Sequence, residues 1–299
     1  MKVLLGVLLV AVVAYGNVIQ PEETTAFGYL TKIGIPEAER IRKAEDEFLN
    51  SPAGRIVGGN PARNGMFPWQ SGLIINMVGT TGVGVCGSSL VSADLLVTAA
   101  HCWHDGINQA WQFTVVLGST LLFSGGLRIE TSNIVMHPEW TPSLIRNDIA
   151  VINLPVRVTF TDFISPISFP RGNERNEIFE DDAATVSGFG RTYDGANISP
   201  NQFLSFVNVQ TMNNRACGIP FLGLVQISNI CTSGAGGRGP CGGDSGGPLY
   251  VHREQRPILV GVVSFGSARG CEAGRPAVYA RFTSFQDWVE SFITTSRKT

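Results

Sequence analysis

The run Gly-Gly-Asp-Ser-Gly-Gly-Pro at residues 242–248 is the part of the sequence most suited to chemistry. A serine hydroxyl is a weak nucleophile until a nearby base takes its proton. Glycines beside it let backbone N–H groups approach a reacting carbonyl and bind the negative charge that develops there. We therefore interpret Ser245 as a nucleophile. The candidate bases are the four histidines of the chain, His101, His104, His137 and His252.

His101 is the best placed of these histidines. It follows the apolar run at 96–100 and precedes Cys102, so a strand end and a neighbouring disulfide would hold its imidazole. A third block, Asn-Asp-Ile-Ala-Val at 147–151, puts Asp148 directly before an apolar strand, although Asn-Asp is also common in surface turns. We interpret the other three histidines as non-catalytic.

A different hydrolase class also fits the serine motif on its own. Residues 243–247 satisfy the G-x-S-x-G pattern of α/β-hydrolases, whose triad runs in the order Ser, acid, His. After Ser245 the only histidine is His252, and neither Asp nor Glu lies between them. The chain also shows no alternating strand–helix units. Both observations exclude that class.

Taken together, three blocks resemble the signature sequences of trypsin- and chymotrypsin-like serine proteases. They lie at 98–102, 147–151 and 243–248, and they follow that family's order of His, Asp and Ser. The similarity extends from residue 56 to about residue 295. It implies a hydrolase that cuts peptide bonds through an acyl-enzyme intermediate.

The resemblance assigns a role to each catalytic residue. Ser245 attacks the scissile carbonyl, His101 moves the proton, and Asp148 holds the imidazole in the required tautomer. The backbone N–H groups of Gly243 and Ser245 form the oxyanion hole.

Arg-Ile-Val-Gly-Gly at 55–59 resembles the activation junction of the same family. It implies a cut after Arg55 and an ion pair between the freed amino group of Ile56 and Asp244, because a buried charge needs a partner. The uncut chain should then be nearly inactive, and a trypsin-like protease should activate it. Residues 17–55 contain no cysteine, so we expect this propeptide to leave after the cut.

The resemblance also locates the specificity pocket. It puts Gly239 at the floor, where trypsin-like members carry an aspartate, and it makes Ser264, Phe265 and Gly266 one wall with Ala277 at the back. An arginine side chain buried without a counter-charge would be costly there. The pocket should therefore accept Phe, Tyr, Leu and Met before the cut bond.

Residues 264–274 and the glycine floor are most similar to the brachyurins, the arthropod serine collagenases. Brachyurins of the best-known kind carry an aspartate in place of Ala277, which puts cleavage after basic residues in doubt here. Whether native collagen is cut stays open at this point. Glu272 and Arg275 lie close in sequence to the pocket residues, but the sequence cannot place their side chains.

The N-terminus divides the chain into functional parts. Met-Lys, an aliphatic run at 3–13 and small residues up to 16 indicate a signal peptide, too short to span a bilayer. We assign 1–16 to this signal, 17–55 to an activation propeptide with an amphipathic helix at 36–49, and 56–299 to the protease domain. No later stretch is long enough to span a membrane.

Secretion implies that the six cysteines form disulfides. Cysteine counting alone leaves several pairings open. The pairing with the shortest loops is Cys86–Cys102, Cys217–Cys231 and Cys241–Cys271.

After residue 56 the sequence consists of short β-rich runs separated by Gly, Pro, Asn and Ser. This texture predicts an all-β fold of two packed antiparallel β-barrels, with their boundary near 165–180. Helical spacing at 285–293 predicts a C-terminal helix packed on the barrels.

The composition narrows the possible partners. The chain has 299 residues, 43% of them hydrophobic, and a formal net charge of −2, so nucleic acid is not an expected partner. We expect no metal or cofactor, because the His-Cys-Trp-His run at 101–104 lacks a second zinc-ligand pair and residues 117–128 contain no carboxylate for a calcium loop. Asn-Ile-Ser at 197–199 is a glycosylation sequon.

The sequence therefore predicts an extracellular, monomeric, digestive endopeptidase, with the gut lumen as its expected location. Its partners would be protein or peptide substrates, the activating protease and protein protease inhibitors. The alternative is a silent homologue that serves as a binding module. A regulatory cascade protease is disfavoured, because no cysteine precedes the protease domain and the pocket floor is not acidic.

Overall fold

Two antiparallel β-sheets form the framework of the chain after residue 62. The structure is a computed structural model that describes residues 20–50, 62–195 and 203–296. The predicted signal peptide, the predicted activation junction at 55–56 and the sequon at 197–199 lie outside the described residues. Everything below concerns the described ranges.

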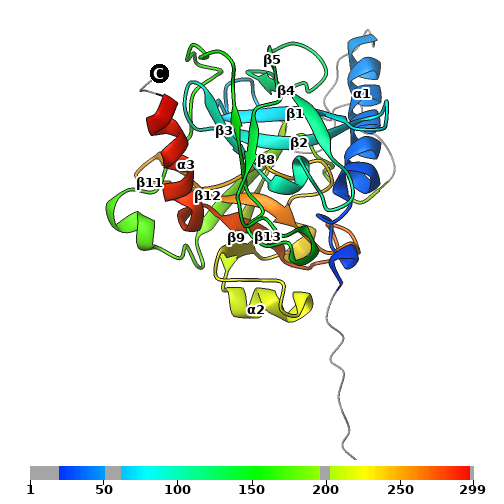
Figure 1. The fold of residues 1–299 in the computed structure, drawn as a ribbon. Coiled ribbons are helices and arrows are strands. Elements are labelled where there is room, and N and C mark those ends of the chain that lie inside the picture. Colours follow the sequence, from blue (N-terminus) through cyan, green and yellow to red (C-terminus); the bar gives the residue numbers. More distant parts are fainter. Residues whose placement is uncertain (1–19, 51–61, 196–202, 297–299) are drawn as a thin grey trace, which may run out of the picture.

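The first sheet has seven strands in the order β5-β4-β1-β2-β3-β7-β6 (Figure 1). Its strands are β1 (Gln70–Met77), β2 (Val83–Leu90), β3 (Leu95–Thr98), β4 (Ala110–Leu117), β5 (Leu127–Thr131), β6 (Ile134–Met136) and β7 (Ala150–Asn153). The four residues of β3 are all buried, which fits the aliphatic run Leu-Leu-Val that precedes Thr98.

The second sheet closes into a barrel in the order β10-β13-β12-β11-β8-β9. Its strands are β8 (Ala183–Gly188), β9 (Ser205–Met212), β10 (Asn229–Thr232), β11 (Pro248–Arg253), β12 (Arg256–Phe265) and β13 (Ala277–Arg281). All of its strand pairs are antiparallel. The chain passes from one sheet to the other between Asn153 and Ala183.

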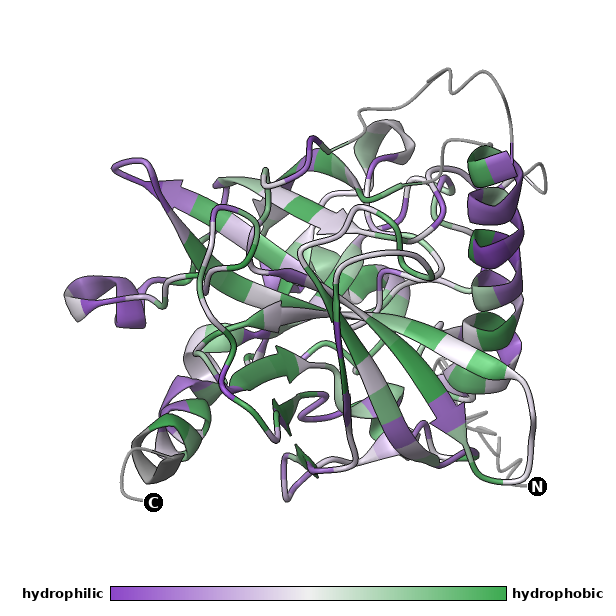
Figure 2. Cartoon of the chain, turned by 90° about the horizontal axis from the view of Figure 1, so that it is seen from above, coloured by the Kyte–Doolittle hydropathy of each residue, from purple (hydrophilic) through white to green (hydrophobic). Residues whose placement is uncertain are grey.

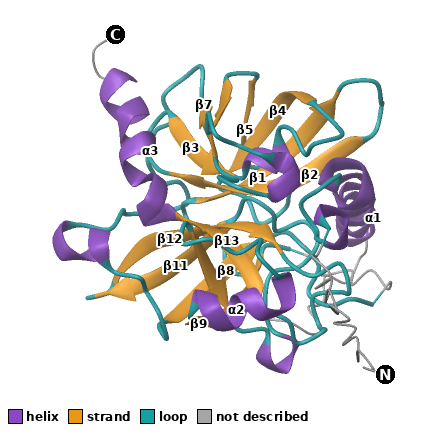
Figure 3. Cartoon of the chain, turned by 60° about the horizontal axis from the view of Figure 1, so that its bottom comes forward, coloured by secondary structure: helices purple, strands orange, loops and turns teal. Residues whose placement is uncertain are grey.

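The first and the last α-helix of the described chain lie on opposite sides of the two sheets (Figure 3). The three α-helices are α1 (Ile35–Asn50), α2 (Asn214–Gly218) and α3 (Phe282–Ser296), and a π-helical turn, η2 (Leu30–Gly34), leads into α1. In α3, Phe282, Phe285 and Val289 are buried in the main core, at the helical spacing expected from the sequence. Short 3₁₀ turns fill the rest, among them η3 (Ala100–Cys102).

Helix α1 has one buried apolar face and one exposed polar face, so it packs with the apolar face toward the protein core. Ile41 and Ala44 are buried, whereas Arg42, Lys43, Asp46 and Glu47 are exposed. Hydrophilic residues dominate the outer part of this helix in Figure 2. The main hydrophobic core includes Tyr29, Leu30 and Ile41 together with residues of the first sheet, so the N-terminal segment is part of the folded body.

Three disulfides form with the shortest-loop pairing, Cys86–Cys102, Cys217–Cys231 and Cys241–Cys271, and each lies within one half of the fold. Each closes a loop that contributes about 3 kcal/mol in the chain-entropy model. Among the helices that the structure describes, none has the length and apolar character needed to cross a bilayer.

The two sheets meet at a tight seam around the serine loop. The N–H of Gly87 on β2 donates to the Ser245 carbonyl at 2.7 Å. The Thr98 hydroxyl donates to the Gly87 carbonyl at 2.8 Å. A Cβ on Gly246 would lie 2.1 Å from the Thr98 oxygen and 2.5 Å from the Gly87 oxygen, so no side chain fits there. The seam thus sets how closely the Ser245 loop approaches the first sheet.

We predict that Gly246→Ala lowers the free energy of unfolding by more than about 2 kcal/mol, because the added methyl must displace backbone. Gly79→Ala is the matched control: its φ is also positive, +78° against +79°, but a Cβ there meets nothing within 4 Å. That control should lose only the conformational part, about 1 kcal/mol. Urea unfolding of the uncut protein measures both, and equal losses would contradict the steric argument.

Candidate active site

His101 and Asp148 come together because the strands before and after them are paired. Antiparallel pairing of β3 with β7 aligns Thr98 with Ala150, so η3 and the residues before β7 emerge at one edge of the sheet. His101 Nδ1 lies 2.7 Å from Asp148 Oδ2, and the His101 backbone N–H donates to Asp148 Oδ1 at 2.9 Å. Both side chains are buried. The imidazole is therefore fixed in position and tautomer.

Asp148 accepts a third hydrogen bond, from a second residue, that the sequence did not reveal. The Ser264 hydroxyl, from the end of β12, donates to Asp148 Oδ2 at 2.6 Å. Burial alone would raise the pKa of Asp148, but the charge of His101 and the hydrogen bonds from His101 and Ser264 outweigh it and hold this pKa below its usual value. Asp148 is thus ionised at neutral pH although no solvent reaches it.

Ser245 lies on the loop before β11 and is buried. Gly243, two residues earlier, has φ +99°, and a Cβ there would lie 2.8 Å from Gly190 Cα. The backbone of this loop can therefore approach a reacting carbonyl closely. In the described part of the chain, His101 Nε2 is buried and has no hydrogen-bond partner. This is the nitrogen expected to take the Ser245 proton.

The Asp244 carboxylate lies against Gly188 and Gly190, where an added Cβ would clash with it. It accepts hydrogen bonds from Gly190 N–H at 2.8 Å and Cys241 N–H at 2.9 Å. Burial raises the pKa of Asp244 to about 6, and these hydrogen bonds oppose the rise only in part. Within the described ranges no lysine or arginine forms an ion pair with Asp244. A buried carboxylate in this state would be stabilised by a cation.

A cavity of ≈ 280 Å³ opens beside Ser245, and four of the residues predicted for the specificity pocket line it: Gly239, Phe265, Gly266 and Ala277. Added Cβ atoms on Gly239 or Gly266 would meet nothing within 4 Å, so both glycines leave open space. Ser264, the fifth predicted residue, is not among the lining residues. It faces Asp148 instead.

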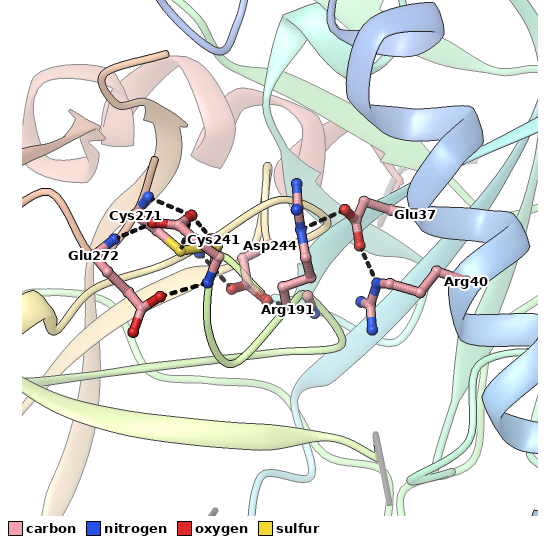
Figure 4. Close-up of a disulfide and its surroundings, with 9 residues drawn as sticks. Glu37, Arg40, Arg191, Cys241, Asp244, Cys271 and Glu272 are labelled. Atoms are coloured by element: carbon pink, nitrogen blue, oxygen red, sulfur yellow. Dashed lines mark hydrogen bonds and ion pairs between the residues drawn. A yellow bond between two sulfur atoms is a disulfide. The ribbon is translucent and has the colours of Figure 1, made fainter. Parts of the chain in front are cut away.

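Charged residues also line this cavity. Arg275 lines it, as does Arg238, which sequence reasoning missed. Glu272 does not line it; its carboxylate accepts the N–H of Asp194 at 2.7 Å (Figure 4). Asp194, also missed, lines the cavity, but its carboxylate accepts the N–H groups of Cys271 and Glu272. No sequence pattern marks such loop-to-loop contacts.

Residues of the N-terminal segment complete the cavity wall. They are Glu22, Thr24, Thr25, Tyr29, Lys32 and Ile33. Ser245 and four of the predicted pocket residues thus line one cavity, and so does a segment that precedes the family-matched part of the chain in sequence.

Two residue groups have the composition of a metal site. They are Cys86, His101 and Cys102, and Asp194, Cys241 and Cys271. In both groups the cysteines are joined as disulfides, and the sulfur of a disulfide is not the thiolate that binds metals. Neither group in the described residues is therefore a candidate metal centre.

Comparison with known proteins identifies the family of this chain. Residues 56–289 match the family model described as Trypsin. The chain belongs to the trypsin family. It is 37% identical over 238 residues to the collagenase of Hypoderma lineatum, covering 79% of this chain and 86% of that protein. It is 36% identical over 239 residues to the brachyurin of Leptuca pugilator, covering 79% and 97%.

The solved structure of HL collagenase superposes with a TM-score of 0.71 at 35% identity, covering 80% of this chain and 99% of the other. The expected fold of two antiparallel β-barrels with a C-terminal helix is thereby confirmed. So is the resemblance to the chymotrypsin-like proteases and brachyurins. The chain is a serine endopeptidase of this family.

The raised pKa of Asp244 predicts that the stability of the uncut protein depends on pH. The folded state holds the proton more tightly than the unfolded chain, so Asp244 contributes stability at low pH that is lost as pH rises from about 4 through about 6. We expect the stability of the uncut chain, relative to its Asp244→Asn variant, to fall by on the order of 3 kcal/mol across this window. Urea unfolding at pH 3.5 and 7 in a Ser245→Ala background measures it. A pH-independent difference would contradict the argument.

Proposed function

We propose that this protein is the zymogen of an endopeptidase whose triad is His101, Asp148 and Ser245. The observation that carries the proposal is the buried pair of His101 Nδ1 and Asp148 Oδ2 at 2.7 Å, beside the loop that carries Ser245. In the proposed reaction, Ser245 Oγ attacks the carbonyl carbon while His101 Nε2 takes the hydroxyl proton. Asp148 stabilises the imidazolium that forms.

The rest of the reaction uses the same groups in turn. The oxyanion is bound by the N–H groups of Gly243 and Ser245. His101 then gives its proton to the leaving amine, and an acyl group stays on Ser245. Water, deprotonated by His101, attacks this ester and releases the acid product, which restores the serine hydroxyl.

Activation is proposed to follow a cut between Arg55 and Ile56 by a trypsin-like protease. The new amino group of Ile56 would pair with Asp244, which is buried and has only N–H partners within the described residues. Residues 1–16 would be a signal peptide and 17–55 the activation propeptide.

The specificity proposal is a preference for large apolar residues before the cut bond. Gly239 and Gly266 leave the cavity open, and Phe265 and Ala277 make its walls apolar. Arg238 and Arg275 line the same cavity and would repel a lysine or arginine. Because two relatives are named collagenase and brachyurin, collagen chains are among the proposed substrates. The proposed setting is extracellular digestion in a gut lumen, by a monomer controlled by protein inhibitors.

The test is to cut the purified zymogen with trypsin, inhibit the trypsin selectively, and map cleavages in a denatured protein mixture by mass spectrometry. We expect cuts after Phe, Tyr, Leu and Met that a Ser245→Ala control lacks. Cuts mainly after Lys or Arg would overturn the specificity. No cuts above the control, despite a complete new Ile56 terminus and removal of the cut-off segment, would favour the silent homologue.

A second variant tests the pocket floor. Gly239→Asp should raise the ratio of kcat/KM for Arg over Phe substrates at least tenfold, roughly 1.4 kcal/mol, because a buried carboxylate disfavours an apolar side chain and attracts a cation. Gly239→Asn, equal in size but uncharged, is the control and should leave the ratio nearly unchanged. Equal ratios in the two variants would show that residue 239 does not face the substrate side chain.

A further inference from the structure

The N-terminal segment pairs with the rim of the cleft as an added strand. Thr24 forms an antiparallel bridge with Ser267. The Thr25 N–H donates to the Gly266 carbonyl at 3.2 Å, and the Gly266 N–H donates to the Thr25 hydroxyl at 2.9 Å. The Ala268 N–H donates to the Glu23 carbonyl at 3.1 Å. An extended peptide bound to a strand edge in this way takes the place that a substrate chain would need.

Tyr29 closes the catalytic centre. Its ring lies edge-on to the His101 imidazole, with 4.9 Å between the ring centroids, and its hydroxyl donates to the Val85 carbonyl at 2.9 Å. Burial, together with the negative charge of Glu37, raises the pKa of this phenol well above its usual range. The Tyr29 ring thus contacts the histidine, and Tyr29 lines the same cavity as Ser245, where a substrate carbonyl has to lie.

The residues around Tyr29 are anchored to the protease body. The Gly28 N–H donates to the Asp105 carbonyl at 3.1 Å, and the Leu30 N–H donates to the Asp105 carboxylate at 2.8 Å. Leu30 is fully buried, and Ala26 is buried in a cluster that contains Phe265 of the pocket wall. Buried apolar side chains combined with hydrogen bonds are typical of a packed protein interface.

Helix α1 extends the cover over the oxyanion loop. Glu37, buried in its first turn, forms ion pairs with Arg40 at 2.7 Å and with Arg191 at 2.6 Å (Figure 4). Arg191 follows Gly190, whose N–H binds Asp244. A Cβ on Gly242 would lie 3.1 Å from the Glu37 carboxylate, so the helix start covers the residue next to Gly243.

The far half of α1 has its own attachment. The Glu45 carboxylate accepts the N–H of Phe123 at 2.9 Å and also that of Leu122. The Arg42 guanidinium lies over the Phe123 ring, 4.6 Å from its centroid. The segment is thus held from Glu23 to Glu45, across the cleft and onto the first sheet.

The segment covers the cleft without offering a bond to be cut. Thr24, Thr25 and Tyr29 form part of the wall of the specificity cavity, yet the space above Gly239 is empty to at least 4 Å from an added Cβ. Among the described residues, no side chain of the segment therefore packs on Gly239 as the residue before a cut bond would, so the segment lacks this element of substrate alignment.

We propose that residues 20–50 are a built-in inhibitor that stays bound in the substrate cleft after Arg55 is cut, so that full activity requires its dissociation as a second step. All the contacts above involve residues 23–45, and a cut between Arg55 and Ile56 breaks none of them. The expectation that the propeptide leaves rested on its lack of cysteine, which removes a covalent tie but not this interface. The inference rests on the proposed protease function.

The test uses the full-length zymogen and variants within the segment. Wild type, Tyr29→Ala, Glu37→Ala and Glu47→Ala are cut with trypsin, which is then inhibited, and complete formation of the Ile56 terminus is checked by mass spectrometry. The catalytic domain, 56–299, is then identical in all four samples. Any difference in activity can therefore come only from the segment. Glu47 is the matched control, since it is an exposed glutamate on the same helix.

At micromolar protein, with a tetrapeptide p-nitroanilide ending in Phe, we expect the Tyr29→Ala and Glu37→Ala samples to be at least tenfold more active than wild type and Glu47→Ala. Size-exclusion chromatography should show the segment co-eluting with cut wild type and separated in the two active variants. A segment that elutes apart from a cut wild type as active as the variants would overturn the proposal while leaving the protease function intact. Inactivity of all four samples, after the segment has been separated, would instead refute the protease function.

Discussion

The seam between the two sheets is the constraint on which the catalytic geometry depends. His101 and Asp148 come from the first sheet, whereas Ser245 and Ser264 belong to the second. Their relative position is set where Gly87 and Thr98 contact the serine loop, through one backbone hydrogen bond and a contact too close for any side chain. Neither sheet holds a complete site, so the chemistry depends on packing to within a fraction of an ångström.

Two buried aspartates show how differently one side chain can be used. Asp148 has an imidazole and two further donors, and its pKa is held low. Asp244 has backbone donors alone within the described residues, and its pKa is raised to about 6. Neighbouring groups thus stabilise the charge of Asp148, whereas burial opposes that of Asp244. The environment, rather than the residue type, sets these opposite pKa shifts, and in the proposed activation the amino group of Ile56 would supply a cation to Asp244.

Local sequence was enough to predict the triad candidates, the strand texture and both long helices, because each depends on neighbours within a few residues. It could not predict that Ser264 binds Asp148 or that Asp194 lines the cavity, since those contacts join residues far apart in the chain. The amphipathic pattern of α1 showed that it has a partner surface but not which one. Tyr29 carried no signal, because a single aromatic residue outside a periodic pattern does not reveal what it touches.

The lack of a cysteine in the N-terminal segment has a consequence for timing. A disulfide-linked segment would stay with its enzyme at any concentration, whereas this one, after the proposed cut at Arg55, would be a separate molecule held only by an interface. While the chain is continuous, the effective concentration of the segment at the cleft is millimolar or more. After the proposed cut it would fall to the concentration of the protein in solution. Dilution would then drive release by mass action. Cut protein would thus stay inhibited while it is held at high concentration. It would become active on dilution, with no further chemical signal.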